Sequence, residues 1–186
     1  ALRDPALAAA IGDSASLVLK GTTDLGGVAK IERLEVGTST VQATYTGEAS
    51  QDRLRGHATG TVPDLSRFEG LAGLQLAGTV KLGLDLDGDL RRGRIDAKLS
   101  GTGDRFATGL PALDGLAGPR VTLAADFSSG GNDTYTVRAA SLDAAHVTVR
   151  AKGGLTRDAS DLAARIELPN LTAADARLAG AASLDA

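Results

Sequence analysis

The sequence predicts an all-β fold: a curled amphipathic sheet of about eleven strands, with a few short helical turns at its mouth or ends. Three observations support this prediction. Apolar and polar residues alternate with a period of two through most of the chain. The 186 residues include 24 glycines but only two tyrosines and three phenylalanines. No apolar run approaches the roughly 18 residues that a membrane-spanning helix needs.

Each predicted strand has one apolar and one polar side. We expect strands over 15–19, 31–36, 41–45, 54–62, 74–86, 95–99, 121–127, 135–139, 147–151 and 162–168. Asp87-Gly88 predicts a tight turn between a strand ending at Leu86 and one starting near Leu90. The glycine-rich and polar stretch 128–133 predicts another hairpin turn.

Four short helical turns interrupt the strands, over 4–11, 64–71, 110–116 and 170–178. A proline begins or precedes each turn, and a glycine follows, as is typical of helix ends. Turns this short are stable only when they pack on the rest of the fold. We therefore expect them to be lids or end plugs on an apolar face.

The chain repeats itself with an offset of 106 residues. The triplet Pro5-Ala6-Leu7 recurs as Pro111-Ala112-Leu113. The same offset relates Gly12 to Gly118, Leu17 to Leu123, Val41 to Val147, Gly47 to Gly153 and Pro63 to Pro169. One pair, Leu34 and Leu142, aligns only if a two-residue gap is allowed.

This repeat predicts the domain organisation. Residues 1–186 form one continuous repetitive β-domain, with copies at approximately 5–80 and 111–186. Because the second copy stops partway through the pattern of the first, we expect the chain to be a segment excised from a longer repetitive protein.

One-sided strands must hide their apolar side in a sandwich, in a closed solenoid, or in an open trough that holds a ligand. The apolar side consists of Leu, Val, Ala and Gly, which fill less volume than aromatic residues and favour a curved sheet with an incompletely filled interior. An aliphatic sandwich stays open as an alternative. The candidate lining residues of the trough are Leu76, Val80, Leu82, Leu84, Ile95, Leu99, Leu123, Phe127, Val137, Val147, Val149 and Ile166.

The composition argues against several classes of function. The chain has no cysteine, and therefore no disulfide, thiol nucleophile or Cys-ligated metal. A net charge of −3 with few aromatics argues against nucleic-acid binding. Both histidines, His57 and His146, are expected on polar sides of strands, and no triad or Gly-x-Ser-x-Gly motif occurs. We expect no catalytic, cofactor or metal site, and a protein that is not an enzyme.

Four segments in order carry a resemblance to a known family: the amphipathic run 76–90, Arg-Ile-Asp-Ala-Lys-Leu-Ser-Gly at 94–101, Leu-Pro-Ala-Leu-Asp-Gly-Leu-Ala-Gly at 110–118, and Ala-Ala-Arg-Ile-Glu-Leu-Pro-Asn-Leu at 163–171. Their succession resembles the TamB proteins of Gram-negative bacteria, within the AsmA-like superfamily of bridge-type lipid transporters. The resemblance implies a large periplasmic β-protein anchored in the inner membrane, whose sheet forms a taco-like, open solenoid-like groove. It also implies phospholipid as cargo. It further implies an Omp85-type outer-membrane partner (TamA or BamA) that binds through regions outside this chain.

The expected function is that of a conduit segment, in which phospholipid acyl chains slide along the apolar groove between the inner and outer membranes. The alternative is a scaffold that spans the periplasm and assists outer-membrane protein insertion without carrying lipid. A closed, fully packed core favours the scaffold, and an open trough favours the conduit.

Overall fold

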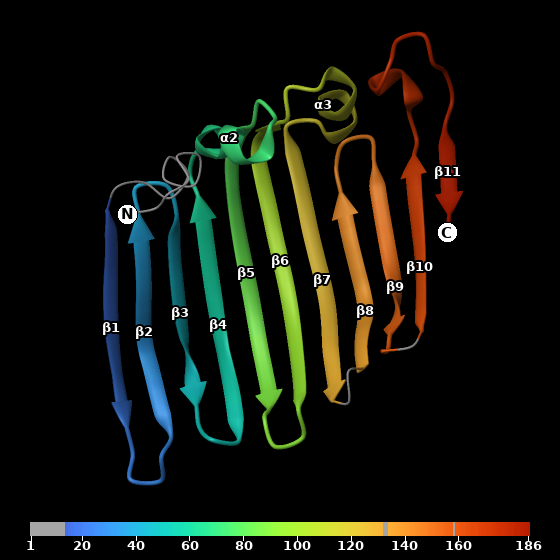
Figure 1. Ribbon diagram of the computed structural model, residues 1–186. Helices are drawn as coiled ribbons and strands as arrows, with labels where there is room; N and C mark the ends of the chain where they lie inside the picture. Colours follow the sequence, from blue (N-terminus) through green and yellow to red (C-terminus); the bar gives the residue numbers. More distant parts are fainter. Residues whose placement is uncertain (1–13, 132–133, 158) are drawn as a thin grey trace.

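The computed structural model of the chain describes residues 14–131, 134–157 and 159–186. In this part of the chain, eleven strands form a single antiparallel sheet in which each strand pairs with its neighbours in sequence, and the sheet is open (Figure 1). The predicted fold class is confirmed. The helical turn expected at 4–11 lies outside the described residues.

The strands are longest in the middle of the sheet. They are β1 (Ala15–Thr23), β2 (Ala29–Thr38), β3 (Gln42–Ala49), β4 (Arg53–Val62), β5 (Ala77–Asp89), β6 (Arg94–Ala107), β7 (Arg120–Gly131), β8 (Thr134–Asp143), β9 (Thr148–Leu155), β10 (Ser160–Leu168) and β11 (Ala182–Asp185).

The short helices lie together at one end of the strands (Figure 1). They are η1 (Leu65–Phe68), α2 (Glu69–Ala72), α3 (Pro111–Ala117) and η2 (Leu171–Ala173). Gly73, with φ +66°, ends α2 in the left-handed conformation that favours glycine. Three of the four expected turns are therefore found, at one end of the sheet.

The turn expected at Asp87-Gly88 is wrong, because β5 continues through both residues to Asp89. Gly88 is buried inside the strand, in register with Leu54 and Ile95. Ion pairs from Asp87 to arginines of β4 hold the polar side of this extension. The chain reverses at residues 90–93 instead, where Gly93 has φ +63°.

His146 is also placed differently from the expectation. It lies in the connection between β8 and β9, not on a strand, and its backbone N–H donates to the carbonyl of Leu116 at 2.8 Å. His57, by contrast, lies on the polar side of β4 as expected.

The strand boundaries recur at the spacing of the sequence repeat. An offset of 106 residues brings β1–β4 and η1 onto β7–β10 and η2 with end points that agree within two residues. The strand register equates Leu34 with Ala140, because Leu34 pairs with Tyr45 as Ala140 pairs with Ala151. The two-residue gap expected at Leu34 is therefore wrong. Excision from a longer chain stays a prediction.

The sheet has no second layer in the described residues. Ala97 is the one buried hydrophobic residue there, and no large side chain is fully buried. The chain exposes 12,027 Å² to solvent, whereas a compact protein of this mass exposes about 8,300 Å². The sandwich and the closed solenoid are therefore wrong for this part of the chain.

Candidate functional site

One face of the sheet is apolar across all eleven strands. Residues in register share a face, so the pairing of the strands defines rows that run across the sheet. The most aliphatic row consists of Leu17, Val36, Ala43, Gly60, Leu82, Gly101, Leu123, Leu142, Val149, Ile166 and Leu184. We call the side that contains this row the apolar face.

The apolar face is large and uncovered. Eleven strands span about 48 Å, and the eight residue steps from Val80 to Gly88 add about 27 Å in the other direction, roughly 1,300 Å² in all. Several bulky side chains on this face are exposed, among them Phe127 at 38%, Leu82 at 42%, Leu184 at 59% and Leu17 at 69%. Monomeric proteins rarely expose an apolar patch above a few hundred Å². This surface is therefore the candidate functional site.

The structure brings most of the predicted lining residues together on this face. Ten of them lie in strands and share it by register: Val80, Leu82, Leu84, Ile95, Leu99, Leu123, Phe127, Val137, Val149 and Ile166. The other two, Leu76 and Val147, each lie one residue before a strand, β5 and β9 respectively. That these residues contact a lipid stays a prediction.

Sequence reasoning missed several residues of the apolar face: Leu17, Leu19, Leu34, Val36, Tyr45, Leu142, Leu162 and Leu184. Two bulges explain part of this omission. The extra residues Glu32 and Arg138 shift the alternation, so that Val137 and Ala140 share a face although they are three residues apart. Ala139, expected beside Val137, pairs with Asp126 on the opposite face.

Tyr45 covers two glycines of the apolar face. Its hydroxyl donates to the carbonyl of Arg55 at 3.3 Å. A Cβ atom placed on Gly56 would overlap the tyrosine ring, and one placed on Gly47 would overlap the Arg55 carbonyl and the tyrosine hydroxyl. Close packing in this region is therefore lateral, between neighbouring strands, since no described segment forms a second layer above it.

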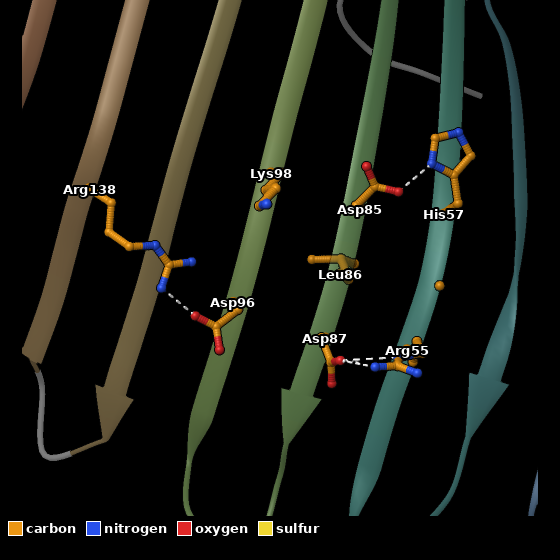
Figure 2. Close-up of a pocket in the computed structure, with 9 residues that line it drawn as sticks. Arg55, His57, Asp85, Leu86, Asp87, Asp96, Lys98 and Arg138 are labelled. Carbon is orange, nitrogen blue, oxygen red and sulfur yellow. Dashed lines mark hydrogen bonds and ion pairs between the residues drawn. The ribbon is translucent and has the colours of Figure 1, made fainter.

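The opposite face is polar and holds ladders of ion pairs (Figure 2). Arg55 binds Asp87 at 2.6 Å, His57 binds Asp85 at 2.7 Å, and Arg138 reaches from β8 to Asp96 of β6 at 2.6 Å. These residues line a shallow hollow of about 570 Å³. Because cations and carboxylates alternate across it, the hollow carries no accumulated charge of one sign.

The pKa shifts on this face follow from the ion pairs. The hydrogen bond from Arg55 holds the pKa of Asp87 below its ordinary value, and the hydrogen bond from Arg138 does the same for Asp96. The pKa of Arg138 is raised, first by Asp96 and then by Asp126. Each group is thereby held in its charged form, which suits an ion-paired surface rather than proton transfer.

Other kinds of site find little support in the described part of the chain. No cluster of three or more His, Asp or Glu residues there could hold a metal ion. Among the described helices, none has the length and apolar character to cross a membrane. No family model, curated protein or solved structure matches this chain.

Proposed function

We propose that the chain binds the acyl chains of phospholipids on its apolar face and is a segment of a bridge-like lipid-transfer protein. The observation that supports this proposal is the apolar face, roughly 1,300 Å² of aliphatic side chains that no second layer of described residues covers. Each methylene removed from water on such a surface contributes up to about 0.8 kcal/mol.

The side chains of this face suit a mobile ligand. They are almost entirely Leu, Val, Ile, Ala and Gly, which offer contact without directional hydrogen bonds. Leu82, Leu123 and Ile166 form part of a row that crosses from strand to strand along the sheet. An acyl chain lying along the rows meets no charged residue that would hold it at one place, while a headgroup is accommodated at the solvated margin.

The motif order of the sequence extends the proposal to the whole protein. By its resemblance to the TamB family, we place the chain in the periplasm, within a longer protein anchored in the inner membrane. That protein would work with an Omp85-type partner, TamA or BamA, and move phospholipid toward the outer membrane without enzymatic chemistry. The uncovered face of this segment is consistent with a conduit.

The test compares the two faces of the same strands. Leu82→Asp with Leu84→Asp puts two charges on the apolar face, and Ser100→Asp with Thr102→Asp puts two charges on the polar face of the adjacent strand. We expect the first pair to reduce binding of a fluorescent fatty acid by about tenfold or more, and the second pair to leave it within about twofold. Circular dichroism of both variants reports whether the sheet is intact.

The scaffold alternative makes the opposite prediction. A periplasmic spacer that assists outer-membrane protein insertion without lipid would purify without bound phospholipid, and both charged variants would bind the probe equally or not at all. Native mass spectrometry of the chain from a Gram-negative host separates the two. Bound phospholipid that is lost in the Leu82→Asp, Leu84→Asp variant favours the conduit.

A further inference from the structure

The outer edge of β1 pairs with no strand among the described residues. All nine residues of β1 are exposed, including Leu17 at 69% and Leu19 at 66% on the apolar face. An edge strand of this length presents unpaired backbone N–H and C=O groups to an incoming strand.

The repeat shows how a strand packs on an edge of this kind. Offset by 106 residues, β1 is the equivalent of β7, and the corresponding edge of β7 is occupied by β6 in antiparallel register. There, Lys98 of β6 lies opposite Asp126. Arg138, the bulge residue of β8, binds Asp126 and reaches past β7 to Asp96 of β6, both at 2.6 Å.

The same positions at the β1 edge carry the opposite charges. Lys20 stands where β7 has Asp126, and Glu32, the bulge residue of β2, stands where β8 has Arg138. Lys20 and Glu32 bind each other at 3.0 Å. The first half therefore has an ion pair at the same two positions as Asp126 and Arg138, but with the positive and negative residues exchanged. Arg33, in register with Lys20, is itself paired with Glu35, so Lys20 and Glu32 carry the charge pattern at this edge.

We propose that the β1 edge binds an extended strand in antiparallel register and selects it by a charge pattern opposite to that of β6. The selected strand alternates apolar and polar residues. It carries a basic residue that reaches Glu32 and, two residues later on the same face, an acidic residue opposite Lys20. A strand with the charges of β6 is disfavoured, because its carboxylate would meet Glu32 and its ammonium would meet Lys20.

Two synthetic peptides that cover residues 94–107 test the proposal on the full chain. Both carry Arg94→Thr, because a two-residue slip would otherwise bring Arg94 near Glu32 and Asp96 opposite Lys20. The first peptide keeps Asp96 and Lys98. The second peptide carries Asp96→Arg and Lys98→Glu, so the two have the same net charge.

We expect the second peptide to bind about tenfold more tightly at low salt, with the difference shrinking as salt screens exposed charges. Hydrogen exchange should show new protection of the β1 amides. The reciprocal protein variant, Lys20→Glu with Glu32→Lys, keeps the internal ion pair and should reverse the preference in favour of the first peptide.

Three results overturn the proposal: neither peptide binds, both bind equally, or the new protection falls on β11 instead of β1. If the Lys20→Glu, Glu32→Lys protein still prefers the second peptide, selection by charge is wrong even if both peptides bind at β1. Each of these outcomes is independent of whether the apolar face binds lipid.

Discussion

The two halves of the sheet share a backbone but not a surface. β1–β4 and β7–β10 have equivalent boundaries and a bulge at the same place. Yet one row of the apolar face has bulky side chains at three of four positions in the first half and is entirely alanine in the second. The row reads Leu19, Leu34, Tyr45 and Ala58 in the first half, and Ala125, Ala140, Ala151 and Ala164 in the second.

Positions that fix the backbone are alike in the two halves. Asp64 and Asn170 both cap the helical turn that follows β4 or β10, accepting a hydrogen bond from the backbone N–H two residues later. Gly47 and Gly153 both lie where a Cβ atom would overlap a carbonyl of the next strand. Side-chain volume on the apolar face and the sign of an exposed ion pair differ between the halves, because neither is packed against a second layer among residues 14–131, 134–157 and 159–186.

The largest predicted effect lies at the two matched glycines. Gly153→Ala forces a side chain into φ +147° and into the Asp161 carbonyl, and Gly47→Ala meets the Arg55 carbonyl. We expect each to lower the free energy of unfolding by about 2–4 kcal/mol, with the greater loss at Gly153. Urea denaturation measures the change. Gly154→Ala and Gly60→Ala, whose nearest atoms would be 3.9 Å and 4.0 Å away, are the controls and should cost much less.

The next largest effect on stability concerns how side-chain volume is divided between two neighbouring residues of adjacent strands. The first half places Tyr45 against Gly56, and the second half has Ala151 and Leu162 at the same positions. Gly56→Leu should clash with the tyrosine ring and cost about 1–3 kcal/mol. The double variant Tyr45→Ala, Gly56→Leu copies the second half and should recover most of that loss. A double-mutant cycle that finds no coupling contradicts the equivalence of the two halves.

The two caps differ in how they respond to pH. Hydrogen bonds from the Ser66 hydroxyl and backbone N–H lower the pKa of Asp64 below its ordinary value of 3.8, whereas Asn170 does not titrate in this range. Because the unfolded chain takes up the proton first, the Asp64 contribution is complete above pH 3.8 and is lost as the pH falls through the folded-state pKa.

Urea midpoints measured between about pH 2 and pH 7 test this difference. Asp64→Asn should remove part of the acid sensitivity and change little at neutral pH. Asn170→Ala should cost about 1 kcal/mol at every pH. An Asn170→Ala loss that disappears in acid contradicts the capping role of the amide.

The alternation of residues predicted the all-β sheet and about eleven strands, and ten of the twelve residues predicted to line the trough lie on one face of it. What it could not predict depends on cross-strand register. Glu32 and Arg138 are ordinary polar residues in the sequence, and only pairing with the neighbouring strand shows that each is an extra residue in a bulge. Gly88 has the local signature of a turn, but the ion pairs of Asp87 extend the strand past it.

The smallest predicted effect tests whether the alanine row is truly uncovered. In a closed core, enlarging alanines to leucines costs typically 1–3 kcal/mol through overpacking. On an open face the new methyl groups extend into solvent, so Ala140→Leu with Ala151→Leu should change stability by no more than about 0.5 kcal/mol. Ala97→Leu is the contrasting site, because Ala97 lies on the same face but is only 3% exposed, in register with Leu86 and Phe127, so its enlargement should be crowded by its lateral neighbours and show an overpacking loss. Equal losses of stability at the two sites would mean that the alanine row is packed as tightly as Ala97. The loss of bulky side chains from this row in the second half would then reflect a covering segment or partner rather than free variation.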